Sequence, residues 1–148
     1  MKHDLEDVYR DLEKEDIAVL PYRFQHIKSV SLAQEKVVGI DRSKIEDRAE
    51  EYTILIHEKG HFDAGAFYTP SCPCLLREQA ECRADRAAIL RYIPLEELRE
   101  VISQGLVEIW ELAERFGVTE AFMKKAVSYY RDIMGESLQL QQPETDGK

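Results

Sequence analysis

Residues 52–61 read Tyr-Thr-Ile-Leu-Ile-His-Glu-Lys-Gly-His, an apolar run that ends in the pattern His-Glu-x-x-His. Apolar residues recur at helical spacing over residues 45–64, so we expect one long helix that is mostly buried in its second half. Residues four apart lie on one helix face, so His57 and His61 could reach the same metal ion. Glu58 is turned by about 100° from His57 and could act on a water molecule without being a ligand. The alternative is a pair of ordinary core or surface histidines.

A catalytic zinc ion usually takes three protein ligands and keeps a fourth position open, so a third ligand is needed. The three cysteines and four acidic residues downstream are candidates. Of the acidic residues, Asp63 follows too closely on the first helix to reach the same face. Glu78, Glu81 and Asp85 are spaced by three and four residues, so they project from one side of a second helix, expected over about 76–92. Glu78 and Glu81 both remain open as the third ligand.

Residues 81–85 read Glu-Cys-Arg-Ala-Asp and are followed by alanines. Together with the His-Glu-x-x-His pattern, this sequence resembles a known family. This family is ImmA/IrrE, which comprises metallopeptidases of mobile elements and bacterial stress responses. Residues 92–98 and 112–130 resemble the matching segments of its phage and prophage members. The resemblance covers roughly residues 17–135 and is strongest in the two proposed metal helices.

This resemblance implies a zinc-dependent metallo-endopeptidase in which His57, His61 and Glu81 bind the metal and Glu58 is the catalytic glutamate. Asp85 matches the aspartate with which glutamate zincins orient a ligand histidine, and a ligating imidazole needs such a hydrogen bond. The alternative for Asp85 is a surface salt bridge with a neighbouring arginine. The implied cofactor is one zinc ion, with manganese as the alternative. The implied substrate is a helix-turn-helix repressor of the same mobile element.

Two further groups of residues near these helices have open interpretations. Tyr68 and Tyr92 could donate a hydrogen bond to a tetrahedral oxyanion, although a tyrosine beside an apolar run more often belongs to the core. Cys72, Cys74 and Cys82 have no second pair at zinc-ribbon spacing. A loop with small buried thiols is therefore favoured over a soft metal site.

The remaining pattern predicts an α+β fold. A short amphipathic helix is expected over residues 4–15, and three short strands are expected between residues 17 and 41. Three helices are expected after Pro94, at about 95–104, 106–116 and 120–134. We therefore expect a zincin-like arrangement, in which a small sheet backs the His-Glu-x-x-His helix and the second ligand helix, with a C-terminal helical subdomain.

These patterns divide the chain into a metallopeptidase core (1–92), a helical subdomain (93–135) and a disordered tail (136–148). The helical subdomain has the outline of a helix-turn-helix, but it could equally be a cap that packs an apolar stripe on the core. That stripe comprises Phe122, Ala126, Tyr130 and Ile133. Residues 93–135 contain eight acidic and five basic side chains, a net charge of −3. This charge favours a scaffold or protein-docking surface over a DNA reader.

The composition fits a single cytoplasmic domain. The 148 residues include 29 acidic and 20 basic side chains, which give a net charge of −9. Such a charge argues against nonspecific binding to nucleic acid or to an anionic membrane. The charged N-terminus leads into no apolar segment of a secretory signal, and no apolar run is long enough to span a membrane. We expect neither a membrane nor a direct nucleic-acid partner.

A non-catalytic function remains as the alternative. The chain could be an adaptor that binds a repressor through its helical region and retains a structural or vestigial metal site. Glu58 counts against this alternative, because a structural site has no use for a general base.

Overall fold

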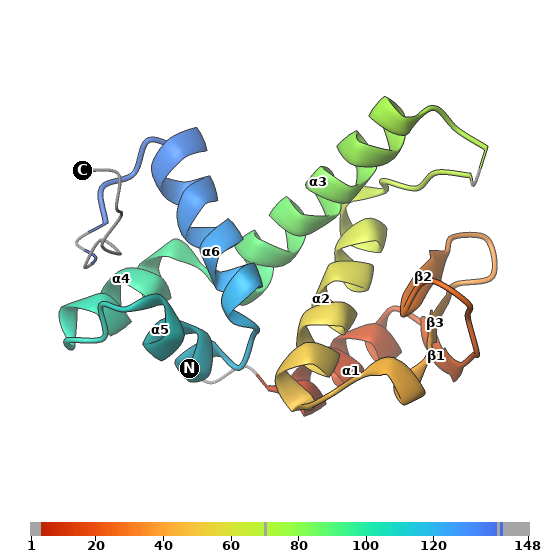
Figure 1. Ribbon diagram of the computed structural model, residues 1–148, viewed down its shortest axis with the longest axis horizontal. Coiled ribbons are helices and arrows are strands. Elements are labelled where there is room, and N and C mark those ends of the chain that lie inside the picture. Colours follow the sequence, from red (N-terminus) through yellow and green to blue (C-terminus); the bar gives the residue numbers. More distant parts are fainter. Residues whose placement is uncertain (1–3, 70, 139, 141–148) are drawn as a thin grey trace.

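The computed structural model describes residues 4–69, 71–138 and 140. Its elements, in chain order, are α1 (Leu5–Lys14), β1 (Ala18–Pro21), β2 (Ser29–Leu32), β3 (Val37–Ile40), the 3-10 turn η1 (Arg42–Lys44), α2 (Arg48–Ala64), α3 (Cys74–Tyr92), α4 (Leu95–Ser103), α5 (Ile109–Phe116), α6 (Glu120–Ser128) and the π-helical turn η2 (Tyr129–Ile133). The described residues thus form six α-helices and three strands, which confirms the α+β class. Figure 1 shows α2 and α3 in the middle of the molecule, with the sheet at one end and α4, α5 and α6 at the other.

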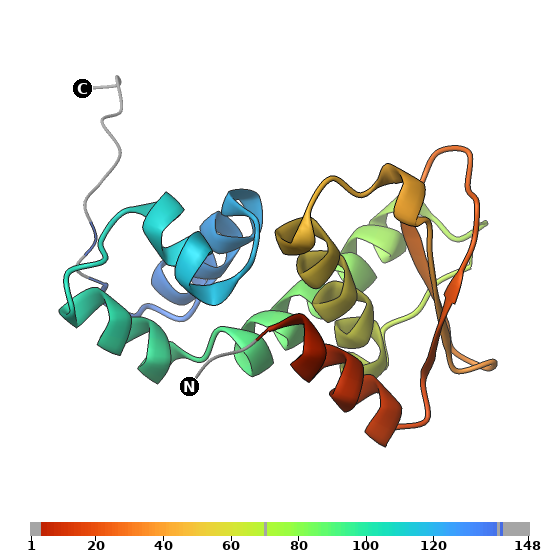
Figure 2. The same cartoon turned by 90° about the horizontal axis from the view of Figure 1, so that it is seen from below.

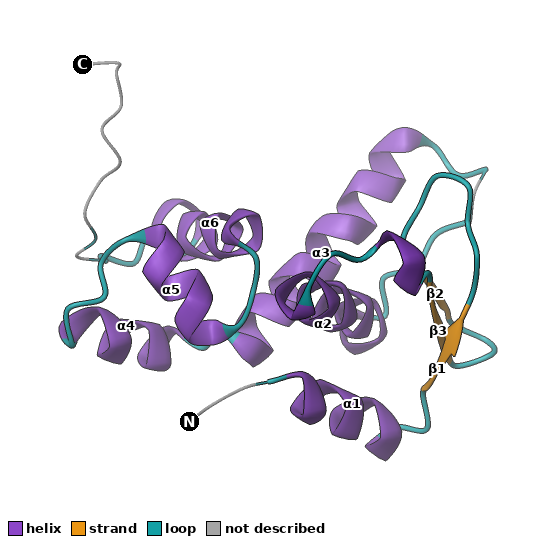
Figure 3. Ribbon diagram, turned by 60° about the horizontal axis from the view of Figure 1, so that its bottom comes forward, coloured by secondary structure: helices purple, strands orange, loops and turns teal. Residues whose placement is uncertain are grey.

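The sheet is mixed, with the strand order β1-β3-β2. Strand β3 pairs in parallel with β1 and antiparallel with β2. Val38 and Ile40 of β3 are fully buried, and both β2 and β3 pack against α2. The strands lie at the end of the molecule opposite α4 (Figure 3). This packing holds β2, an edge strand, against the helix that carries His57 and His61.

Helix α2 begins at Arg48, three residues later than expected, because Asp47 caps it. The Asp47 carboxylate accepts a hydrogen bond from the Glu50 backbone N–H at 2.9 Å, which satisfies one of the free amides of the first turn. The helix ends where Gly65 takes the left-handed conformation with φ 62°. Helix α3 begins at Cys74, two residues earlier than expected and directly after Pro73.

The backbones of α2 and α3 are in contact at Gly60 and Ala84. A Cβ atom added at Gly60 would lie 2.1 Å from the carbonyl oxygen of Ala84 and 2.9 Å from its carbonyl carbon. Ala80 and Ala88, one helical turn on either side of Ala84, are also buried. Small residues thus let the two helices approach until the backbone of one meets the backbone of the other.

One continuous hydrophobic core includes residues from α1 to η2. It therefore spans the boundary between residues 92 and 93 that was expected from the sequence. Two hydrogen bonds also join these parts: the Thr119 backbone N–H donates to Thr53 Oγ1 at 3.0 Å, and Lys125 Nζ donates to Asp85 Oδ2 at 3.1 Å. Figure 2 shows α4, α5 and α6 grouped beside α2 and α3. The helical subdomain is therefore packed onto the rest of the molecule.

The expected apolar stripe of α6 is correct for Phe122, Ala126 and Tyr130, which are buried, and wrong for Ile133, which is 58% exposed. The cause is the π-helical turn, in which the Met134 N–H donates to the Tyr129 carbonyl five residues earlier. A π-helical turn holds more residues than an α-helical turn, so side chains beyond it rotate out of the 3.6-residue register.

The predicted disordered tail, 136–148, falls mostly outside the described residues. Of its described residues, Glu136 accepts a hydrogen bond from the Arg99 guanidinium at 2.7 Å, and Leu138 packs against the core. Within the described part of the chain, no helix is both long enough and apolar enough to cross a membrane.

We predict that Gly60→Ala destabilises the protein, although alanine is the better helix former by about 1 kcal/mol. The added methyl group would overlap the Ala84 backbone, which cannot rotate away, and overpacking of this kind costs about 1–3 kcal/mol. Urea unfolding followed by circular dichroism measures the change. Gly65→Ala is the control, because it adds only left-handed backbone strain, with no atom within 4 Å of the new carbon. An unchanged or raised free energy of unfolding for Gly60→Ala would contradict the contact.

Candidate metal centre

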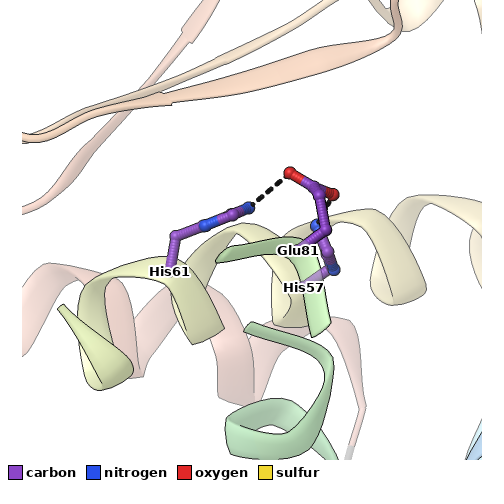
Figure 4. Close-up of side chains that lie close together, drawn as sticks. All are labelled: His57, His61 and Glu81. Carbon is purple, nitrogen blue, oxygen red and sulfur yellow. Dashed lines mark hydrogen bonds and ion pairs between the residues drawn. The ribbon is translucent and has the colours of Figure 1, made fainter. Parts of the chain in front are cut away.

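His57 and His61 of α2 each direct their Nε2 atom towards Glu81 of α3 (Figure 4). His57 Nδ1 lies 2.7 Å from Asp85 Oδ1, and His61 Nδ1 lies 2.6 Å from the Ala66 carbonyl oxygen. Both partners are acceptors, so Nδ1–H is the donor in each pair and Nε2 faces the site. The Nε2 atoms of His57 and His61 lie 2.9 and 3.1 Å from the two carboxylate oxygens of Glu81.

His57, His61 and Glu81 form a group that could hold a metal ion. Their potential ligand atoms all lie within 4.8 Å of one another. Two imidazole nitrogens and one carboxylate oxygen form a donor set found in zinc hydrolases, and the three residues leave further coordination positions to water. Glu78, the rival third ligand, is not part of this group; it is exposed, and its carboxylate lies 3.8 Å from the Cys74 thiol.

The acidic residues around the histidines favour a cation at the site. Burial would lower the pKa of His57, but its hydrogen bonds with Asp85 and Glu81 outweigh burial and raise that pKa to about 10. The hydrogen bonds with His57 and His61 hold the pKa of Glu81 well below its usual range. Glu81 is therefore a carboxylate at neutral pH. Its negative charge stabilises a positive charge beside it, either a protonated imidazole or a metal ion.

Glu58 is buried beside the metal group without belonging to it. Ser29 Oγ donates to one oxygen of its carboxylate and Ser31 Oγ to the other, each at 2.6 Å. Both serines belong to β2, and residues two apart in a strand share a face. The Ser-Val-Ser alternation indicates that the two serines share one face of a strand, but it does not indicate that this face contacts Glu58.

Tyr68, one of the two tyrosines considered from the sequence, lies at the site. Tyr68 belongs to the loop between α2 and α3, and its hydroxyl donates a hydrogen bond to Glu81 Oε2 at 2.9 Å. Burial and the contact with Glu81 raise the pKa of Tyr68 to about 12. Tyr92, in contrast, is a core residue whose hydroxyl donates to Asp11 at 2.7 Å. A role for Tyr92 as an oxyanion donor is therefore wrong.

Asp85 contacts His57 with one carboxylate oxygen and Lys125 of α6 with the other, at 3.1 Å. The alternative salt bridge with a neighbouring arginine is wrong. Arg83 donates to the Ala64 carbonyl instead, and Arg86 lies over the ring of Tyr129. No sequence pattern indicates the contact with Lys125, which follows Asp85 by 40 residues.

The three cysteines do not form part of the metal group. Cys72 is half-buried and Cys74 and Cys82 are exposed, and all three are free thiols. The expectation of small buried thiols is therefore wrong for two of the three.

Comparisons of the chain with protein-family models, with curated proteins and with solved structures found no match. Membership of the ImmA/IrrE family thus stays a prediction from the sequence motifs. The geometry defines the site only as a group of two histidines and a glutamate beside a buried, hydrogen-bonded glutamate.

We predict that the protein binds about one equivalent of Zn²⁺ and that Glu81→Gln weakens binding by more than about 100-fold. The amide retains the size of the side chain but removes the charge that attracts the cation. Isothermal titration calorimetry measures both values. Glu78→Gln is the matched control one turn away on α3 and should bind like the wild type. Equal losses in the two variants, or none in Glu81→Gln, would exclude Glu81 as the third ligand.

Proposed function

We propose that the protein is a metal-dependent endopeptidase of the glutamate-zincin type. The observation that carries this proposal is the position of Glu58. Its carboxylate follows His57 directly in the chain, is held by two serines and lies outside the group of ligand atoms. A carboxylate fixed beside a metal group without being a ligand suits a general base.

In the proposed reaction, Glu58 takes a proton from the attacking water molecule and passes it to the leaving amine. A bound zinc ion supplies Lewis acidity, which makes water more acidic and polarises the scissile carbonyl group. A carboxylate has about four lone-pair positions, so the hydrogen bonds from Ser29 and Ser31 leave acceptor capacity on both oxygens. The serines limit the rotation of Glu58 and thereby orient it for proton transfer.

Tyr68 is the proposed donor to the oxyanion that develops on the carbonyl group. Its hydroxyl lies within hydrogen-bond distance of Glu81, which is a proposed metal ligand. A phenol hydroxyl keeps its proton at neutral pH and can donate it to a hydrogen bond. Tyr68 is 40% exposed, so a substrate carbonyl group could approach its hydroxyl.

The proposed substrate is a helix-turn-helix repressor of the same mobile element, which is the substrate class implied by the ImmA/IrrE resemblance. The α+β fold, with a sheet beside the two metal helices, is compatible with a zincin-like arrangement. Two imidazole ligands favour zinc over manganese. The net charge of −9 and the free thiols support a cytoplasmic protein that acts on another protein.

We predict that Glu58→Gln abolishes cleavage of the proposed repressor substrate and leaves zinc affinity almost unchanged. Loss of the general base should lower kcat by at least about 100-fold, because the amide cannot accept the proton. Electrophoresis with mass spectrometry measures cleavage, and calorimetry measures metal binding. Glu13→Gln, the same replacement at an exposed glutamate of α1, should cut like the wild type. Equal cleavage by wild type and Glu58→Gln, or none by the wild type, would refute the peptidase and favour a repressor-binding adaptor.

We predict that Tyr68→Phe lowers kcat by about 100-fold with little change in KM or zinc affinity. The hydroxyl would act mainly on charge that develops in the transition state, so its removal should affect the chemical step more than substrate binding. Steady-state kinetics on the same repressor separates kcat from KM. A change confined to KM would instead assign Tyr68 to substrate binding, and unchanged kinetics would remove it from the mechanism.

A further inference from the structure

A groove of about 580 Å³ separates α3 from α6 and η2. One face of α3, from Arg77 to Ile89, forms one wall, and residues from Lys124 to Ile133 form the other. Helices α3 and α6 diverge in Figure 1. Glu81, which is part of the metal group, also lines this groove. The groove is therefore continuous with the proposed catalytic site, and its volume lies within the range of ligand-binding pockets.

The groove is lined by four basic and three acidic side chains, whereas the protein as a whole is acidic. Four of its lining residues are cations, and two of these are Arg86 on α3 and Lys124 on α6. No carboxylate in the described part of the chain forms an ion pair with Arg86 or Lys124, whereas Asp85 is already paired with His57 and Lys125. These two cations remain available to carboxylates of a ligand.

The end of the groove at η2 is apolar. Ile89, Tyr129 and Ile133 line it there, and Arg86 lies 5.7 Å above the centre of the Tyr129 ring. The π-helical turn brings Ile133 out of the core, so that 58% of this side chain is exposed. An apolar surface beside two available cations suits a ligand that combines an apolar side chain with carboxylates.

We propose that this groove binds the substrate peptide next to the scissile bond and selects segments in which carboxylates flank an apolar side chain. This inference rests on the proposed endopeptidase function and names the substrate class of the same site. Nucleic acid fits the groove less well, because its backbone carries a negative charge at every nucleotide and would meet Glu78, Glu81 and Asp85 as well as the cations. Single carboxylates of a peptide can instead lie against Arg86 and Lys124 alone.

Binding to the zinc-loaded Glu58→Gln variant tests the groove independently of cleavage. Two fluorescent decapeptides share a central leucine, which glutamates flank in one peptide and lysines in the other. Fluorescence anisotropy should show at least about tenfold tighter binding of the acidic peptide. Equal affinities, or no binding of the acidic peptide, would overturn the proposal.

Substitutions within the groove locate the binding site. In the Glu58→Gln background, Arg86→Glu and Lys124→Glu should each weaken binding of the acidic peptide by about tenfold. Lys14→Glu makes the same charge change at the end of α1 and is the control. Similar losses in all three variants would show that net charge, not the groove, determines binding, and would overturn the proposal.

The apolar end has its own pair of variants. Ile133→Ser should weaken binding of the acidic peptide by about tenfold, because it removes exposed apolar surface from the groove. The control is Leu90→Ser, since Leu90 is 52% exposed on α3 and does not line the groove. Wild-type affinity in Ile133→Ser would exclude the apolar contact, and with it the proposed selection of an apolar side chain.

Cleavage and competition distinguish the remaining outcomes. If the acidic peptide binds as expected but wild-type enzyme does not cut it or the repressor, the groove assignment stands and the peptidase function fails. If wild-type enzyme cuts both peptides equally well, the peptidase function stands and the groove assignment fails. Displacement of the acidic peptide by a short DNA duplex, with the same dependence on Arg86 and Lys124, would make the groove a nucleic-acid site and overturn the proposal.

Discussion

The contact between the backbones of α2 and α3 at Gly60 and Ala84 determines the geometry of the metal centre. His57 and His61 lie on α2 and Glu81 lies on α3, so the spacing of the two helices sets the distance between the imidazoles and the carboxylate. A residue with a Cβ atom at the position of Gly60 would force the helices apart. The glycine between the two histidines is thus part of the site, although it offers no ligand.

The side chains of the site are oriented by partners from several other elements. His57 is held by Asp85 of α3, His61 by the carbonyl of Ala66 in the following loop, and Glu58 by two serines of β2. Lys125 of α6 extends this network from Asp85 into the helical subdomain. Side chains held in this way need little reorganisation to bind an ion or transfer a proton, which is the condition for efficient electrostatic catalysis.

The sequence predicted those features that depend on local periodicity. The helices, the three strands and the common face of the two histidines follow from spacing along the chain. The choice of Glu81 over Glu78 as the third ligand came from the ImmA/IrrE resemblance. The sequence could not predict contacts made across the fold, such as those of Ser31 with Glu58 and Lys125 with Asp85, because their partners are far apart in the chain. It also misplaced Ile133, since a π-helical turn leaves no mark in an α-helical pattern.

Helices α2 and α3 together present one group of two histidines and a glutamate that could hold a metal ion. X-ray absorption at the zinc edge of the zinc-loaded protein tests whether these residues are the ligands. We expect scattering from two imidazole rings at about 2.0–2.1 Å and from oxygen at about 2.0–2.2 Å, with no sulfur. A sulfur shell at about 2.3 Å, which would implicate the cysteines near the site, or scattering from only one imidazole would contradict this expectation.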